Sequence, residues 1–296
     1  MELPRLLTVR SAKRHGLTER QLSGPRFRRL LRGVYLNSPD EPTLTEQAAA
    51  ALLVMPADAV IIGVTALWLH GVEVGSAQPV RVATATTSHT THAGIRLSRL
   101  GRLPAARRRL AVPTDAWLAA CAELDLVETT MAADWLIRLG SVTADALRSA
   151  AAGATGPGGR IARRAAALAR SGAESPQETR LRLLLVLAGL PEPTCNPMIG
   201  TGTAPIGRFD LALEEFMTLI EYDGDHHRTD PIQWSRDIAR QEAAVRAGYS
   251  VIRVTHGRMQ QPREIAATVA DQLRTRGYRG RPPSFNRTWR KLFEPG

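Results

Sequence analysis

Residues 209–228 read FDLALEEFMTLIEYDGDHHR, two apolar runs on either side of an acidic turn. Side chains of a β-strand point alternately to the two faces of a sheet. If both runs are strands, one face of the resulting hairpin is apolar. The side chains predicted to share this face are Phe209, Leu211 and Leu213 of the first strand with Ile220 and Tyr222 of the second. The stretch therefore predicts a β-hairpin that buries one face in a hydrophobic core.

The other face of this hairpin gathers carboxylates. With the turn centred at 215–216, Asp210 lies opposite Glu221, and Arg208 lies opposite Asp223. Asp210, Glu221 and Asp223 then point to the same side of the sheet, and cross-strand neighbours have Cβ atoms about 5 Å apart. We therefore expect three carboxylates on one sheet face.

Carboxylates this close repel one another unless a cation lies among them. Their oxygens suit Mg²⁺ or Mn²⁺, which would lower the pKa of a bound water and hold phosphate oxygens. Asp210, Glu221 and Asp223 are thus the predicted metal ligands. The alternative is a hairpin whose polar face is acidic and simply faces solvent.

A helix is predicted before the hairpin, from SPQETRLRLLLVLAGL at 175–190. Ser175 is the expected N-cap and Pro176 occupies the first helical position. Glu178 stands three residues after the N-cap, where it would complete a capping box. Its other interpretation is a fourth carboxylate at the site, and the sequence leaves both open.

A second helix is predicted after the hairpin, with Asp230 as N-cap, Pro231 at its first position and Gly248 as its C-terminal stop. The strand YSVIRVT, 249–255, and a helix from 262 to 274 follow. The expected order from Ser175 is helix, weak strand, strand, strand, helix, strand, helix. The fold class is therefore α/β.

This αβββαβ order, with Asp210 followed by Glu221-Tyr222-Asp223, resembles the PD-(D/E)XK nuclease superfamily. The segments IEYDGDHHR, DIARQ and AGYSVIRVT make it more similar to the branch akin to very-short-patch repair endonucleases, and the likeness covers about 80 residues. The resemblance implies Mg²⁺- or Mn²⁺-dependent hydrolysis of phosphodiester bonds in DNA. It matches Asp210 to the metal-binding aspartate and Glu221 to the acidic residue of the (D/E)XK element.

One position departs from the motif of the superfamily. Asp223 stands where the motif has its lysine, which helps to polarise water or stabilise the transition state. The repair-endonuclease branch relies on histidine instead, and His227 is the matching position here. A histidine could deprotonate water or donate to phosphate charge. The resemblance thus implies His227 as a catalytic residue, with Glu178 auxiliary; the alternative for His226-His227 is an exposed loop.

Arginines of the segment RDIARQ, 236–241, are candidates for contacts with the nucleic-acid backbone. Arg236 and Arg240 are the two residues in question, and Asp237 accompanies Arg240 in a helix element that matches the branch. For Arg240 the alternative is an ion pair on the helix surface.

The N-terminal segment has the outline of helix, turn, helix and basic hairpin, with a helix ending at Gly16, Thr18 as the next N-cap and Gly33 at a bend. GLTERQL, RRLLRGVYL and AVIIGVTALWLHG make it similar to the winged-helix domain of AbiEi-type antitoxins. The residues of the hairpin expected to bind nucleic acid are Arg26, Arg28, Arg29 and Arg32.

These patterns divide the chain into five segments. We expect a winged-helix DNA-binding domain at 1–75, a middle α/β region at 76–150, a linker at 151–174, a nuclease-like domain at 175–277 and a basic tail at 278–296. The middle region shows no catalytic constellation.

Composition favours a polyanionic partner. The 296 residues carry a formal net charge of +11, and because Lys13 and Lys291 are the two lysines, nearly all the basic charge is arginine. Arginine contacts to phosphate release counterions whatever the sequence; a solvated basic surface is the alternative. The charged start is unlike a signal peptide, and no window holds the roughly 18 apolar residues of a membrane helix, so we expect a cytoplasmic protein.

Two other functions stay open. The chain would be a DNA-binding regulator or antitoxin if its nuclease domain is inactive, as the missing lysine allows. It would be an interaction protein of a toxin or phage-defence module if its basic surface binds an acidic partner. No GxxxxGK[ST] phosphate loop is present, so no nucleotide cofactor is predicted.

Overall fold

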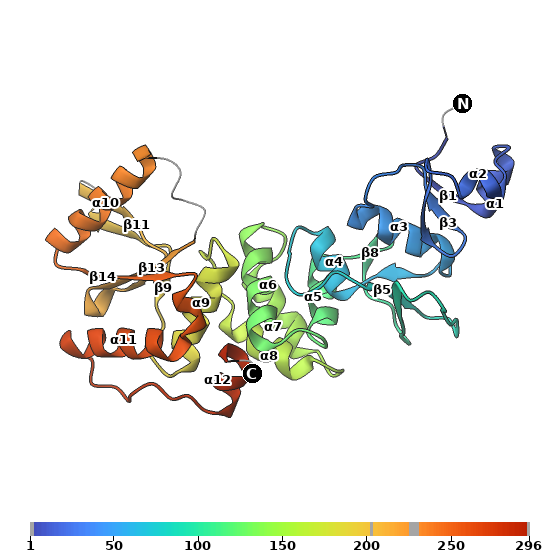
Figure 1. The fold of residues 1–296 in the computed structure, drawn as a ribbon. Helices are drawn as coiled ribbons and strands as arrows, with labels where there is room; N and C mark the ends of the chain where they lie inside the picture. Colours follow the sequence, from blue (N-terminus) through green and yellow to red (C-terminus); the bar gives the residue numbers. More distant parts are fainter. Residues whose placement is uncertain (1–2, 202–203, 225–230, 295–296) are drawn as a thin grey trace. The chain divides into compact units, whose positions relative to one another are not determined.

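The computed structural model describes residues 3–201, 204–224 and 231–294 (Figure 1). Within them the chain is a mixed α/β protein with four sheets and twelve helices. It divides into two compact units, Met1–Leu124 with Asp145–Arg163, and Asp125–Ala144 with Arg164–Gly296. None of the described helices is long and apolar enough to cross a membrane.

The two units are a coarser division than the five segments expected from the sequence, and the chain passes between the units three times. Helix α6 (Leu126–Arg138) belongs to the second unit although it precedes α7 (Ala144–Ala152) of the first. The predicted linker, 151–174, contains helix α8 (Gly159–Leu168). The five-segment division stays a prediction.

The first unit begins with a small three-stranded antiparallel sheet in the order β1-β3-β2. Thr18 caps the second helix as predicted, and Gly33, at φ +80°, forms the bend between the last two strands. Leu7, Ala12 and Leu22 form the core of this part. Its elements are β1 (Leu6–Thr8), α1 (Val9–Arg14), α2 (Glu19–Leu22), β2 (Arg28–Leu31) and β3 (Val34–Leu36).

The rest of the first unit is built around a five-stranded sheet in the order β6-β5-β4-β8-β7. Inside it, buried Arg81 forms an ion pair with Glu123 at 2.7 Å. The elements are α3 (Leu44–Val54), β4 (Val60–Ile61), α4 (Gly63–Leu69), β5 (Val80–Thr84), β6 (Ile95–Arg99), β7 (Ala106–Arg107), β8 (Leu110–Ala111) and α5 (Pro113–Ala120).

The second unit is built on the sheet β14-β13-β12-β9, in which β13 and β14 are parallel and the other pairs antiparallel. Helix α10 covers one face of this sheet and α11 the other (Figure 1). Its elements, besides α6, are α9 (Pro176–Leu187), β9 (Thr194–Cys195), β10 (Met198–Thr201), β11 (Ala204–Arg208), β12 (Leu211–Leu213), β13 (Thr218–Asp223), α10 (Pro231–Arg246), β14 (Ser250–Thr255), α11 (Pro262–Thr275) and α12 (Arg287–Phe293).

The predicted hairpin register is confirmed where β12 and β13 pair, with Leu211 opposite Ile220 and Leu213 opposite Thr218. The first strand is not continuous, however. It stops after Arg208, which belongs to a separate hairpin of β10 and β11, and resumes at Leu211. The predicted pairing of Arg208 with Asp223 is therefore wrong.

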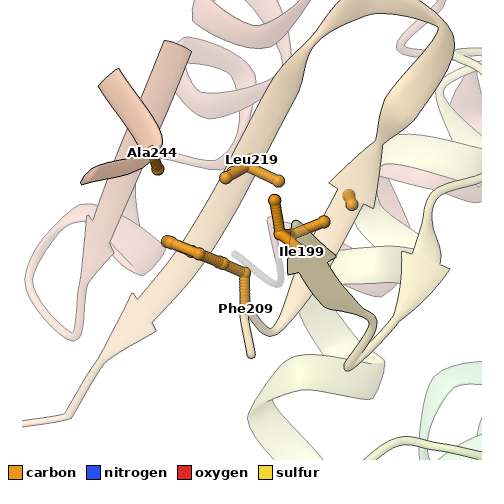
Figure 2. Packing of buried hydrophobic residues seen from close by; sticks show 5 residues of the cluster. Ile199, Phe209, Leu219 and Ala244 are labelled. Atoms are coloured by element: carbon orange, nitrogen blue, oxygen red, sulfur yellow. The ribbon is translucent and has the colours of Figure 1, made fainter. Parts of the chain in front are cut away.

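This interruption also places Phe209 on the face opposite to the predicted one. Phe209 packs with Ile199, Leu219 and Ala244 of helix α10 (Figure 2), and not with Leu211. Both faces of β12 and of the first half of β13 are buried. The open acidic face expected from strict alternation is consequently absent from this part of the described structure.

The segment predicted as a basic tail, 278–296, contains a helix. Residues 287–293 form helix α12, which Asn286 caps by accepting from the Trp289 amide. The buried Trp289 indole donates to the Leu184 carbonyl of α9 at 3.0 Å. Packing of aromatic side chains thus holds this basic segment against helix α9.

Candidate active site

Asp210 lies in the bend between β11 and β12, at the edge of the sheet. Its backbone carbonyl accepts from the Asn196 amide at 2.8 Å, which fixes the bend. Its Oδ2 atom accepts from the backbone N–H of Tyr222 on β13 at 2.7 Å. The bend between β11 and β12 therefore turns this carboxylate toward the neighbouring strand β13.

The carboxyl of Asp210 is electrostatically strained. The pKa of Asp210 is raised from 3.8 to about 7, mainly by burial and in addition by the carboxylates of Glu178 and Glu221. The Tyr222 amide and the Arg240 guanidinium oppose this rise. Strongly perturbed carboxyls concentrate at functional sites. Asp210, Glu178 and Glu221 thus form an acidic cluster at one edge of the sheet, which we call the carboxylate cluster.

Glu178 reaches this cluster from the first turn of helix α9. Ser175 is the N-cap as predicted, because its Oγ accepts from the Glu178 amide at 3.1 Å. The reciprocal half of the predicted capping box is wrong: the Glu178 carboxylate accepts from the Glu174 amide at 2.8 Å and from Asn196 Nδ2 at 2.6 Å. This arrangement ties the start of α9 to the bend that positions Asp210.

Glu221, on β13, is 8% exposed, and both its oxygens are hydrogen-bonded to helix α10. Arg240 Nη1 lies 2.6 Å from Oε1, and Gln241 Nε2 lies 2.7 Å from Oε2. Burying carboxylate oxygens costs free energy unless hydrogen-bond donors such as these satisfy them. Arg240 therefore brings a cation into the carboxylate cluster, and Arg208 brings a second one near Glu178 and Asp210.

Arg240 is not simply a surface ion-pairing residue, although it also contacts Asp237 at 3.1 Å. Its side chain is 24% exposed, its Nη1 also donates to the Arg208 carbonyl, and its guanidinium carbon lies 4.8 Å from the centroid of the Phe209 ring. Gly207, at φ +145°, leaves room for the Arg240 side chain, because a Cβ at this position would lie 2.6 Å from Arg240 Cδ. A contact with phosphate by Arg240 stays a prediction.

Asp223 lies at the end of β13, where its Oδ2 is 3.6 Å from Arg253 Nη1. Arg208, the partner predicted for Asp223, instead forms an ion pair with Glu174. The structure brings Glu178 close to Asp210 and Glu221, and metal binding by Asp223 stays a prediction.

His227, the predicted catalytic histidine, and its neighbour His226 lie outside the described residues. Among the described histidines, His256 follows strand β14, and its Nδ1 lies 3.4 Å from the Tyr222 hydroxyl. Sequence analysis did not select His256; its place directly after a strand that runs parallel to β13 is the signal that could have found it.

The arginines predicted to bind nucleic acid differ in their surroundings. In the N-terminal hairpin, Arg29 and Arg32 are exposed, as is Arg236 at the start of α10 in the other unit. Arg26 Nε donates to Asn37 at 3.0 Å, and Arg28 forms an ion pair with Glu41 at 2.5 Å. Nucleic-acid binding by all these arginines stays a prediction.

A divalent metal fits part of this arrangement. Asp210 and Glu221 offer oxygens at a place of excess negative charge, and Mg²⁺ commonly binds through one or two carboxylates with waters and phosphates completing its shell. Across the described ranges, however, no group of three or more Asp, Glu, His or Cys side chains is arranged to hold a metal ion. The fit therefore rests on two protein ligands, with Glu178 close by.

Comparison of the chain with protein-family models, curated proteins and solved structures gives no match.

Proposed function

We propose that the second unit is a metal-dependent nuclease that hydrolyses phosphodiester bonds of DNA. The observation that carries this proposal is the carboxylate cluster, in which burial and two neighbouring carboxylates raise the pKa of Asp210 to about 7 in a chain of net charge +11. The order α9-β12-β13-α10-β14-α11 around the sheet β14-β13-β12-β9 supports a PD-(D/E)XK-like fold.

In this proposal Asp210 and Glu221 would hold Mg²⁺ or Mn²⁺. A metal bound there would lower the pKa of a water and hold phosphate oxygens. Glu178, fixed by the Asn196 amide group, contributes negative charge beside Asp210. The Tyr222 amide orients Asp210 toward β13. The Arg240 guanidinium donates to Glu221 Oε1 at 2.6 Å, so a metal bound to that oxygen would displace the guanidinium. The released guanidinium would then be free to contact a substrate phosphate.

We further propose that the first 75 residues act as a winged-helix DNA-binding domain. The order β1-α1-α2-β2-β3 with a basic hairpin supports this proposal. Exposed Arg29 and Arg32 would contact the phosphate backbone, which adds affinity without sequence preference. A cytoplasmic location is part of this proposal.

The test is cleavage of supercoiled, linear, single-stranded and mismatched DNA in Mg²⁺, Mn²⁺ or EDTA. We expect metal-dependent cleavage that Asp210→Asn and Glu221→Gln abolish. Asp223→Asn is a separate variant, because its loss of activity would restore Asp223 to the ligand set. Metal-dependent cleavage that survives both Asp210→Asn and Glu221→Gln would show that a contaminant or another site is responsible.

A second candidate is a DNA-binding regulator whose nuclease domain is inactive. The specific observation in its favour is that Arg240 and Gln241 engage both oxygens of Glu221, while Asp223 occupies the position of the motif lysine. This candidate predicts DNA binding that EDTA does not change, and no nicking of supercoiled DNA.

A further inference from the structure

A cavity of about 700 Å³ lies within the second unit, a volume in the range of small-ligand sites. Its apolar floor includes Met259 and Phe293, which are both buried. Polar side chains surround this floor. The polar lining includes Gln177 and Arg180 of α9, His256 after β14, Gln260 before α11, and Glu264 of α11.

Helix α12 makes one wall of this cavity, and its position is fixed by packing. Trp289 is held by the Leu184 carbonyl, and its ring centroid lies 5.1 Å from that of Phe293. The end of the helix is held by Glu294, which receives two hydrogen bonds from Arg263, at 2.6 and 2.8 Å. The cavity is therefore pre-formed in the folded chain.

Arg180 brings a cation to the cavity. Its side chain is half-buried, and its guanidinium carbon lies 5.8 Å from the centroid of the Phe293 ring. Within the described ranges no carboxylate lies at ion-pair distance from Arg180, whereas Arg263 at the same cavity is neutralised by Glu294. A half-buried arginine of this kind is best matched by an anionic ligand such as phosphate.

The cavity and the carboxylate cluster are connected through β13. The Tyr222 amide donates to Asp210, while the Tyr222 hydroxyl lies 3.4 Å from Nδ1 of His256, which lines the cavity. On helix α9, Gln177 of the cavity directly precedes Glu178 of the cluster. Both features lie at the carboxyl ends of the parallel strands β13 and β14, the edge where α/β sheets bind ligands.

We propose that this cavity binds one phosphorylated nucleotide of an unpaired strand, next to the carboxylate cluster. Arg180 would pair with the phosphate, the glutamine amides would donate to and accept from the base edge, and the apolar floor would cover the base. The inference rests on the proposed function for the identity of the ligand as DNA. It deepens that function by naming single-stranded or unpaired DNA as the substrate class.

The test is fluorescence anisotropy of the full chain with a labelled single-stranded DNA hexamer, a labelled duplex and unlabelled dAMP as competitor, all in EDTA. Arg180→Gln should weaken hexamer binding about five- to tenfold. It should also reduce the steepness of log K against log salt concentration by about 0.7, the value for one phosphate contact of a single strand. Gln260→Trp places a bulky side chain at the exposed rim and keeps every charge, so it should also weaken hexamer binding. Arg274→Gln is the matched control, because Arg274 pairs with Asp271 on α11 and does not line the cavity.

The inference is overturned if Arg180→Gln and Gln260→Trp both bind the hexamer as the unaltered chain does, or if Arg274→Gln weakens binding equally. Binding of dAMP, followed directly by calorimetry, in a chain that does not bind the hexamer would assign the cavity to a free nucleotide and overturn the strand assignment. Because no metal is present, loss of hexamer binding in the cavity variants is independent of cleavage. Cleavage with unchanged hexamer binding would refute this inference alone, and absence of cleavage with weakened binding would refute the nuclease alone.

Discussion

Replacing Asp210 by Asn should stabilise the protein at alkaline pH in the absence of metal. The native pKa of about 7 exceeds the ordinary value of 3.8, so the native state keeps the proton that the unfolded state loses between these values. Below about pH 4 Asp210 therefore lowers the free energy of unfolding only slightly. Its destabilising effect grows with pH and is complete above about pH 7. A difference of about three between the two pKa values corresponds to about 4 kcal/mol.

The expected gain is smaller than this maximum because Asp210 is partly exposed. We expect Asp210→Asn to raise the free energy of unfolding by about 2 kcal/mol at pH 8.5, and by less than half of that at pH 5. The asparagine Oδ1 keeps an acceptor for the Tyr222 amide, so the hydrogen bond at 2.7 Å survives the substitution. The charge alone is thereby removed.

The assay is a urea titration in EDTA at pH 5 and 8.5, with a short deuterium pulse and mass spectrometry of peptides from β13. These peptides report the second unit separately from the first. Asp271→Asn, an exposed carboxylate on α11, should change stability by less than about 0.5 kcal/mol at either pH. Equal destabilisation of Asp210→Asn at both pH values would refute the reasoning, because Asp210 would then act only as an acceptor for the Tyr222 amide.

Three further predictions concern charged side chains and one glycine of the second unit. Arg240→Gln should tighten Mn²⁺ binding about fivefold in calorimetry, about 1 kcal/mol, since the guanidinium competes with the metal for Glu221. Asp134→Ala should lower the free energy of unfolding of the second unit by about 3 kcal/mol in the urea assay, because it removes the buried partner of Arg182 at 2.9 Å and leaves Glu192, at 3.0 Å, as the remaining carboxylate. Gly207→Ala should cost about 1–3 kcal/mol, since the glycine has φ +145° and a Cβ would meet the Arg240 side chain.

Each of these predictions has a control variant or a result that would contradict it. For metal binding, unchanged or weaker Mn²⁺ affinity in Arg240→Gln would show that the arginine is structural. For the buried pair, Asp145→Ala removes an exposed aspartate that pairs with Arg148, and should cost less than about 1 kcal/mol. For the glycine, a stability equal to the unaltered chain would contradict the close approach of Arg240 to the β11 backbone.

The sequence determined the elements whose signals are local. The residues that begin and end a helix are set by their neighbours in sequence. Ser175 therefore begins helix α9, and Gly248 follows the end of helix α10, as predicted. The register of β12 and β13 followed from the apolar alternation on either side of the turn. The residues of the carboxylate cluster were also recognisable, since Asp210, Glu178 and Glu221 are acidic residues next to apolar strands or a helix N-terminus.

The tertiary structure decided which of these residues meet. Alternation predicts faces only within an unbroken strand, and the break before Leu211 moved Phe209 to the other face. Arg240 reached Glu221 because Gly207, far away in sequence, leaves room for its side chain. Such contacts depend on how separate elements pack and on which backbone positions lack a side chain. Local periodicity contains no information on either, which is why sequence identified the carboxylates while only the packed fold placed the Arg240 guanidinium against Glu221.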